Sequence, residues 1–514
     1  MQTSEAIGCS VCGKTPRDIR AHSCPLHICI TLLGMDIPVF HLDFFNNRSL
    51  IALIAVLHVV INHGMAVGGI PLVVYMERTG VRTGSTAWDT LAYRVLSAFF
   101  VITTTVGALT GVGIWLSASL VNPYAIGSLL RVFFWTWFTE WLVFVTEVVL
   151  ILIYFLTWKS WTANRKGSHV RLGYGLAIAS WITMALIVSI LGFMMDPGSW
   201  KSDRTLLSGM LNPMYLPQLA FRTPLAMVMA GAYGWATLLW STQRGSELRI
   251  QAVRTLSRWT LLWIIPCIFG GLWYARAVPS AMQAHLPVAL LTQALEGWAQ
   301  NARLVLGFVA LLIALLMGWG AIKPHRIPRG VLLIPALLSI ALIGVFERVR
   351  EFIRKPYAIP SYLYSNGFRV DDYPILQRDG ILTHATYTSV RHVTSDNQLV
   401  AGKEVFNLAC TRCHTVDGIN GIRDILHRMY NQKDAWGATQ PWRADSISSY
   451  LGAMHNARPF MPPFPGSPTE RDALAAWLAS LQFHRDVIDG AQVSGVTVLP
   501  PAKQNRDGSF SANP

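Results

Sequence analysis

Charged side chains are scarce in this sequence. Asp, Glu, Lys and Arg together make up 14% of its 514 residues, whereas a soluble domain carries about 25%. A chain of this length with so few charges and 52% apolar residues does not have the composition of a large soluble protein. The composition favours a membrane protein with one small additional domain.

Acidic residues are the scarcer of the two charge types, so the formal net charge is +14. Such a balance is compatible with nucleic acid, anionic lipid or the cytoplasmic loops of a membrane protein. The basic residues fall largely between apolar runs, and no basic helix has the interleaved aromatic residues that suit nucleic acid. We therefore expect contact with membrane lipid and no nucleic-acid partner.

The sequence also lacks the framework of paired cysteines that stabilises small secreted domains. Cys267 stands alone in an apolar run and is expected to be a buried small hydrophobe. Two further groups remain, one near the start of the chain and one at Cys410 and Cys413.

Residues 1–34 have no signal-peptide architecture, because they contain no clean apolar region followed by a small-residue cleavage site. Cysteine and histidine, the ligand types of a zinc site, occur there at Cys9, Cys12, Cys24, Cys29, His22 and His27. The alternative that we favour is a start codon assigned too early, since Met35 opens a segment that leads directly into the first apolar run.

Eight apolar runs are long enough to cross a bilayer, which takes about 20 residues of helix. They cover residues 49–76, 95–119, 129–158, 171–195, 216–240, 257–276, 302–321 and 331–348. We therefore predict an all-α fold, a polytopic transmembrane bundle of about eight spans over residues 35–349.

The Lys and Arg residues of the loops predict the orientation of this bundle, because cytoplasmic loops carry an excess of them. The loops after the odd-numbered runs hold fourteen, and those after the even-numbered runs hold five. We expect a multi-pass protein of the cell inner membrane with both chain ends on the periplasmic side.

The composition changes after the last apolar run. Residues 350–398 are predicted to be a polar linker, residues 399–484 a compact helical domain, and residues 485–514, rich in Pro, Gly, Ser and Asn, a disordered tail.

A Cys-x-x-Cys-His motif, Cys410-Thr411-Arg412-Cys413-His414, lies in the compact domain. This pattern attaches one haem c through two thioether bonds and supplies the proximal histidine ligand. Met461, in a proline-stiffened segment, is the expected sixth ligand, with Met454 and His455 as the alternatives. The whole segment resembles a class I cytochrome c, and histidine–methionine ligation suits electron transfer.

Several ionisable residues fall inside the apolar runs, where such residues are costly and usually functional. Glu140 and Glu147 are seven residues apart, so they share one helix face at about 10 Å separation. They are candidates for a proton path or a metal-linked site, or they are neutral acids bonded to other helices.

Two histidines lie in the first run. His58 and His63 are about 140° apart around a helix, so they do not bind one iron together. We favour His58 over His63 as a haem ligand; the alternative for each is a hydrogen-bonded core histidine. Arg222, near the outer end of the fifth run, suits haem propionates or acts as a snorkelling anchor.

The segment IALIAVLHVVINHGMAVGGIPL resembles the first span of subunit I of cytochrome bd quinol oxidases. The resemblance places His58 on a haem-ligating histidine, and Glu140 and Glu147 near the two glutamates of that family. Residues 351–359 are similar to its Gly-Arg-Gln-Pro-Trp region. The resemblance implies one or more b-type haems, with haem d as an alternative that the ligands do not distinguish.

The chain departs from this family at the low-spin haem. The histidine and methionine ligands of that haem are replaced by Arg222 and by the run Arg303-Leu304-Val305, and the compact domain stands in place of a ninth span. The resemblance therefore does not imply the quinol site beside that haem.

Three functional hypotheses follow. The first is a respiratory oxidoreductase subunit, similar to a terminal oxidase, that passes electrons between haem c and membrane haems and reduces a small acceptor such as oxygen. The second is quinol:cytochrome c electron transfer. The third is a membrane anchor subunit that carries a cytochrome c. The expected partners are other respiratory membrane subunits, soluble or membrane c-type cytochromes and, in the second case, quinol.

Overall fold

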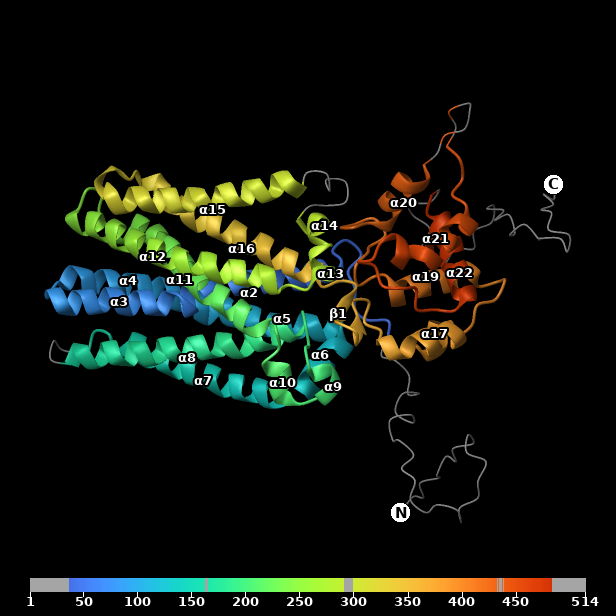
Figure 1. Cartoon of the computed structure of the whole chain (residues 1–514), viewed down its shortest axis with the longest axis horizontal. Helices are drawn as coiled ribbons and strands as arrows, with labels where there is room; N and C mark the ends of the chain where they lie inside the picture. The colour runs from blue at the N-terminus through green and yellow to red at the C-terminus, as the bar shows by residue number, and fades with distance from the viewer. Residues whose placement is uncertain are drawn as a thin grey trace, which may run out of the picture.

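The computed structural model describes residues 37–161, 165–290, 299–431, 433, 437 and 439–482. The N-terminal extension, with its zinc-site alternative, and the predicted tail lie outside these residues. The described chain consists of a bundle of long helices that run alongside one another, with a smaller helical domain at one end of the bundle (Figure 1).

Seven helices of the described residues are long and apolar enough to cross a membrane, which confirms the predicted polytopic helical fold. The first two are compound helices: α2 (Asn47–Ile61), η1 (Asn62–Val67) and α3 (Gly69–Thr83), followed by α4 (Thr86–Ile102), η2 (Thr103–Gly107) and α5 (Ala108–Val121). The others are α7 (Phe134–Thr157), α8 (Lys166–Phe193), α12 (Glu247–Ala277), α15 (Ala299–Ile322) and α16 (Ile334–Ile353).

The fifth predicted run forms α11 (Tyr215–Ser241), a helix of 27 residues that is not among these seven. It packs against α3, α8, α12 and α16, and Gln218 and Arg222 are fully buried within it. Because other helices pack against α11, the buried Arg222 finds protein partners in His63 and Glu347. This central helix therefore organises the bundle.

Glycines allow α11 and α12 to approach closely. A Cβ atom at Gly231 would lie 2.0 Å from the Thr260 hydroxyl oxygen, and one at Gly270 would lie 2.2 Å from the Ala220 carbonyl oxygen. Small residues at such crossings are the usual means of tight helix packing in membranes.

Shorter elements connect the long helices. They are α6 (Pro123–Val132), α9 (Trp200–Asp203), α10 (Leu206–Met210), α13 (Ser280–Gln283), α14 (Leu286–Leu290), η5 (Pro324–Arg326) and η6 (Arg329–Leu333). Elements α6, α9, α10, α13 and α14 lie at the end of the bundle that faces the small domain (Figure 1).

The small domain is built on α19 (Gln398–Ala409), α20 (Ile422–Tyr430), α21 (Ala444–Ala457) and α22 (Pro468–Ser480). Helices α19 and α22 cross closely: a Cβ atom at Gly402 would lie 2.2 Å from the Ala473 carbonyl oxygen. The rings of Phe406 and Trp477 pack at 5.0 Å beside this crossing. This crossing forms the centre of the domain core.

The segment predicted as a linker has structure of its own. It contains β1 (Tyr357–Ile359), the antiparallel β2 (Leu363–Tyr364), η7 (Val370–Asp372), α17 (Tyr373–Asp379) and α18 (Ile381–His384). Its side chains Phe368, Leu376 and Ile381 join the core of the small domain, as do Ile37 and Val39 from the start of the described chain. That core therefore combines residues that precede and follow the membrane helices.

Candidate haem sites and the junction between the domains

The Cys-x-x-Cys-His segment forms one tight turn after α19. The backbone amides of Cys413 and His414 donate to the Cys410 carbonyl oxygen at 3.0 and 2.9 Å. Both sulfur atoms belong to half-buried residues, and burial raises the pKa of Cys410 to about 12. The pocket thus favours an uncharged sulfur, which is what a haem thioether provides.

The ring of His414 is oriented by Asn420, whose carbonyl oxygen lies 3.2 Å from Nδ1. A proton on Nδ1 leaves Nε2 with its lone pair, as a haem-ligating histidine requires. Burial lowers the pKa of His414, which keeps the ring neutral for ligation. The residues present therefore fit a covalently attached haem c.

Met461 lies in a loop that the preceding helix holds in place. Its amide donates to the Arg458 carbonyl oxygen at 2.8 Å, and its own carbonyl oxygen lies 2.6 Å from His455 Nδ1. Met454, by contrast, is buried in the domain core. Of the three sequence candidates for the sixth ligand, His455 thus positions the loop and Met454 packs the core, which favours Met461.

The haem-binding turn is docked on the first membrane helix. The Arg48 amide donates to the Arg412 carbonyl oxygen at 3.2 Å, and Ile419 donates to Phe44 at 2.8 Å. Asn46 caps α2 by accepting from Ser49, and its side-chain amide donates to Ile419 at 3.0 Å. The N-terminus of α2 is therefore tied directly to the turn.

Arg412, between the two cysteines, strengthens this junction although it is almost fully buried. Its Nε donates to the Val121 carbonyl oxygen, at the end of α5, at 3.1 Å. Its terminal nitrogen donates to the Asn366 carbonyl oxygen. The middle residue of the motif thus joins the two membrane helices nearest the turn to the small domain.

Basic residues from the end of α16 and the start of α2 lie beside the turn. Lys355 Nζ is 3.6 Å from Cys413 Sγ, and the Arg48 guanidinium lies over the Phe352 ring at 4.9 Å. Arg354 forms an ion pair with Glu351. The membrane domain therefore presents a positively charged surface to the cysteine side of the haem-binding turn.

A cavity of about 750 Å³ separates other parts of the two domains. Lys201, His285 and Lys355 line it from the membrane side, and His455 and Arg458 line it from the small domain. Most of its other lining residues are apolar, and Asp196 is the one acidic residue among them. The cavity thus suits an apolar group that carries carboxylates.

His58, the favoured membrane ligand, lies on α2 and faces η2 and α5. Its Nδ1 is 3.1 Å from the Gly107 carbonyl oxygen, and its Nε2 is 2.7 Å from the Asn62 side-chain nitrogen. A hydrogen bond from Nδ1 to Gly107 makes Nε2 the lone-pair nitrogen, which one rotatable amide contacts. His58 therefore has the donor chemistry of a haem ligand.

His63 is held in a different environment. Arg222 approaches its Nε2 at 3.1 Å, and the other end of the guanidinium donates to Glu347 at 2.6 Å. Arg350 donates to the second oxygen of Glu347 at 2.9 Å. His63 therefore belongs to a buried polar chain and offers iron no free nitrogen without breaking a hydrogen bond.

The same chain of buried polar side chains gives Arg222 a protein partner. The sequence predicts a residue for haem propionates, whereas in the structure its guanidinium contacts the carboxylate of Glu347. The sequence analysis did not single out Glu347. A glutamate at the end of an apolar run is a signal that would have identified it.

Glu140 and Glu147 lie on α7 as their spacing predicts. Glu147 accepts from the Thr183 hydroxyl group of α8 at 3.4 Å, and Glu140 is half-buried. The structure does not bring either carboxylate to His58 through a hydrogen bond among the described residues. Glu147 lies instead at the interface between α7 and α8.

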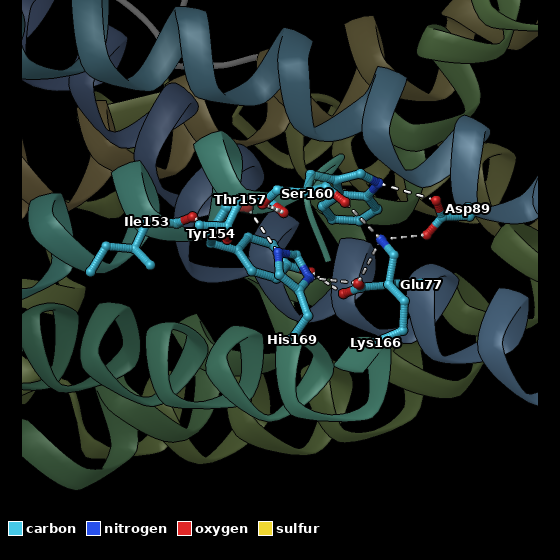
Figure 2. A network of polar contacts seen from close by, with 9 residues as sticks. Glu77, Asp89, Ile153, Tyr154, Thr157, Ser160, Lys166 and His169 are labelled. Carbon is cyan, nitrogen blue, oxygen red and sulfur yellow. Dashed lines mark hydrogen bonds and ion pairs between the residues drawn. The ribbon is translucent and has the colours of Figure 1, made fainter. Parts of the chain in front are cut away.

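Sequence reasoning also missed a polar network at the opposite end of the bundle (Figure 2). Glu77, fully buried, accepts from Tyr154 at 2.7 Å, and His169 Nδ1 lies 2.6 Å from it. Lys166 bridges Glu77 at 3.4 Å and Asp89 at 2.9 Å. The network joins α3, α4, α7 and α8, and Glu77, directly after the first apolar run, was the signal available for it.

Comparisons with known proteins agree with this arrangement. The cytochrome c family model matches residues 399–482, which supports a covalent haem c. Among solved structures, a bd oxidase from Geobacillus thermodenitrificans matches with a TM-score of 0.51 and 17% sequence identity, covering 62% of this chain and 89% of that one. No curated protein matches this chain in sequence.

The bd oxidase likeness extends over the membrane bundle as a likeness of fold, and the cytochrome c match accounts for the domain after it. Together they indicate a haem-containing electron-transport protein of a membrane. The chain thus combines a membrane domain whose fold is similar to that of a bd oxidase with a C-terminal segment that matches the cytochrome c family.

Proposed function

We propose that this chain is a respiratory electron-transfer subunit that passes electrons between haem c on the periplasmic side and one or more b-type haems in the membrane domain, with oxygen as the terminal acceptor. Cys410 and Cys413 attach haem c, which supplies a one-electron carrier, and His414 and Met461 ligate its iron. His58 ligates a membrane haem.

The observation that carries this proposal is the docking of the haem-binding turn on α2. Arg48 contacts Arg412 through the backbone, and His58 lies ten residues further along the same helix. Ten residues of α-helix rise about 15 Å. The same rigid element thus begins at the haem c turn and carries the favoured membrane ligand at a distance compatible with electron tunnelling between cofactors.

The distribution of basic residues supports the periplasmic placement. The end of the bundle away from the cytochrome c domain carries most of the loop Lys and Arg residues, which is the pattern of a cytoplasmic face. Covalent haem c on the opposite side agrees with attachment outside the cytoplasm.

Proton supply follows the face of α7. Glu140, Glu147 and Tyr154 succeed one another at seven-residue intervals, so they lie along one side of the helix. Tyr154 donates to Glu77 in the network at the far end. We propose that Glu140 and Glu147 convey protons toward the membrane site from that side.

Opening the junction tests the electron path. In Gly418→Val, the new Cβ atom would lie 2.1 Å from the Phe44 carbonyl oxygen, which forces the junction apart. In Gly452→Ala, the new Cβ atom would meet only the flexible end of Arg471, at 2.9 Å. With ascorbate and a mediator as donor to haem c, optical spectra follow the b-type signal. We expect slow reduction of that signal in Gly418→Val and a wild-type rate in Gly452→Ala.

A purified wild-type protein with a c-type signal and no protohaem signal would overturn the role of the membrane domain. Equal rates in both glycine variants would overturn the junction as the electron path. Rapid reduction of haem c by quinol in membranes would favour quinol:cytochrome c electron transfer and reverse the proposed direction.

A further inference from the structure

Lys355 is a membrane-domain residue that contacts the haem-binding turn. It follows α16 directly, is 8% exposed, and places Nζ 3.6 Å from Cys413 Sγ. In the protein with haem c attached, that sulfur atom is a thioether substituent of the haem. A cation from the membrane domain therefore lies next to the cofactor edge of the cytochrome c domain.

The neighbouring charges do not cancel this cation. Glu351 forms its ion pair with Arg354, and Lys355 takes part in no ion pair in the described part of the chain. Arg48, the other cation beside the turn, is half-buried and stacks over Phe352. Glu351 is thus one carboxylate among three cations, and the cysteine side of the turn faces a net positive charge.

From this contact we infer that Lys355 tunes haem c: its positive charge raises the reduction potential, so that the membrane domain sets the potential of the cytochrome c domain docked on it. Reduction of haem c adds one electron to the iron and breaks no bond. The oxidised form carries one more positive charge than the reduced form, and a cation held in a site of low dielectric constant destabilises it more.

The inference rests on the proposed attachment of haem c at Cys410 and Cys413. It does not depend on the direction of electron flow or on the acceptor. Lys355 is not a ligand of the haem iron. It contacts Cys413, a side chain that carries the haem, and acts by placing a positive charge beside it.

Redox titration of the c-type absorbance in the full-length purified protein tests the inference. We expect Lys355→Met to shift the equilibrium about tenfold toward the oxidised form, which lowers the midpoint potential by about 59 mV for one electron. Lys355→Arg retains the charge and should retain the potential. Lys323→Met is the matched control, because Lys323 is exposed and follows α15.

Lys355→Gln serves as a second neutral variant with a polar end. A wild-type potential in either neutral variant, with haem c attached, would overturn the inference. The inference would also be overturned if the Lys355→Arg protein assembled and neither neutral variant did, because Lys355 would then have a structural role. A wild-type protein without covalent haem on a denaturing gel would overturn the proposed haem attachment itself. This result distinguishes failure of the proposed function from failure of the inference about Lys355.

Discussion

The backbone amide of Arg48 donates a hydrogen bond of 3.2 Å to the carbonyl oxygen of Arg412. Arg48 lies in the first turn of the first membrane helix, and Arg412 lies between the two cysteines of the haem-binding motif. This contact places the cofactor of the small domain at the entrance to the membrane bundle. The predictions below test the sites on either side of it.

The first prediction concerns covalent attachment. Replacing both Cys410 and Cys413 with alanine should abolish the haem signal on a denaturing gel, because no thioether bond then survives unfolding. Cys267→Ala is the matched control, since Cys267 lies within α12 and should leave the signal unchanged. Haem that remains covalently bound in the double variant would contradict the assignment.

The second prediction concerns the sixth ligand. Met461→Ala should lower the reduction potential of haem c, because methionine ligation raises it, and should change the oxidised spectrum. Met454→Leu alters a buried methionine of the same domain and should change neither. A spectrum lost in Met454→Leu but kept in Met461→Ala would reverse the assignment.

The third prediction separates the two histidines of the first span. His58→Ala should remove one protohaem from the pyridine haemochrome count, since rotation of the Asn62 side-chain amide is enough to free its Nε2 for iron. His63→Ala should retain that haem, because His63 contacts Arg222 instead. Equal haem content in wild type and His58→Ala would exclude His58 as a ligand and favour the anchor hypothesis.

The fourth prediction concerns the buried pair of Arg222 and Glu347. Replacing either partner alone, as in Arg222→Met or Glu347→Leu, leaves the other charge buried and should cost about 3–5 kcal/mol of stability. The double variant should regain only part of that loss, because Arg350 also loses its partner when Glu347 is replaced. Thermal unfolding in detergent of the four proteins measures the coupling; additive losses would show that the pair does not interact.

The fifth prediction concerns Glu77. Glu77→Leu removes the acceptor of Tyr154 and His169, and it should lower stability by about 3–5 kcal/mol because donors remain buried without it. Glu247→Gln, an exposed glutamate at the start of α12, is the control and should unfold like the wild type. An unchanged unfolding temperature in Glu77→Leu would mean that water replaces the carboxylate.

The sequence predicted the elements that follow from local pattern. Apolar runs of membrane length located the helices, and the Cys-x-x-Cys-His motif located the cytochrome c domain, because both signals lie within short segments. Helix α11 was also located, although its position at the centre of the bundle was not, since hydropathy does not report which neighbours surround a helix.

Contacts between distant segments were beyond the sequence pattern. Arg222 pairs with Glu347, and Glu77 with His169, across separate helices, and no spacing rule links such residues. The same applies to Lys355, one of several basic residues after the last span. Its contact with Cys413 depends on the docking of the two domains, which is a property of the fold.

The core of the cytochrome c domain holds Ile37 and Val39 from before the first membrane helix together with residues as late as Leu481. During synthesis, Ile37 and Val39 are made before the membrane helices, whereas their packing partners are made after them. The domain can complete its core only after the last helix has been made, and its closure then joins both ends of the bundle on one side. A chain truncated before α22 would therefore leave Ile37 and Val39, just before the first span, without a complete core to pack into.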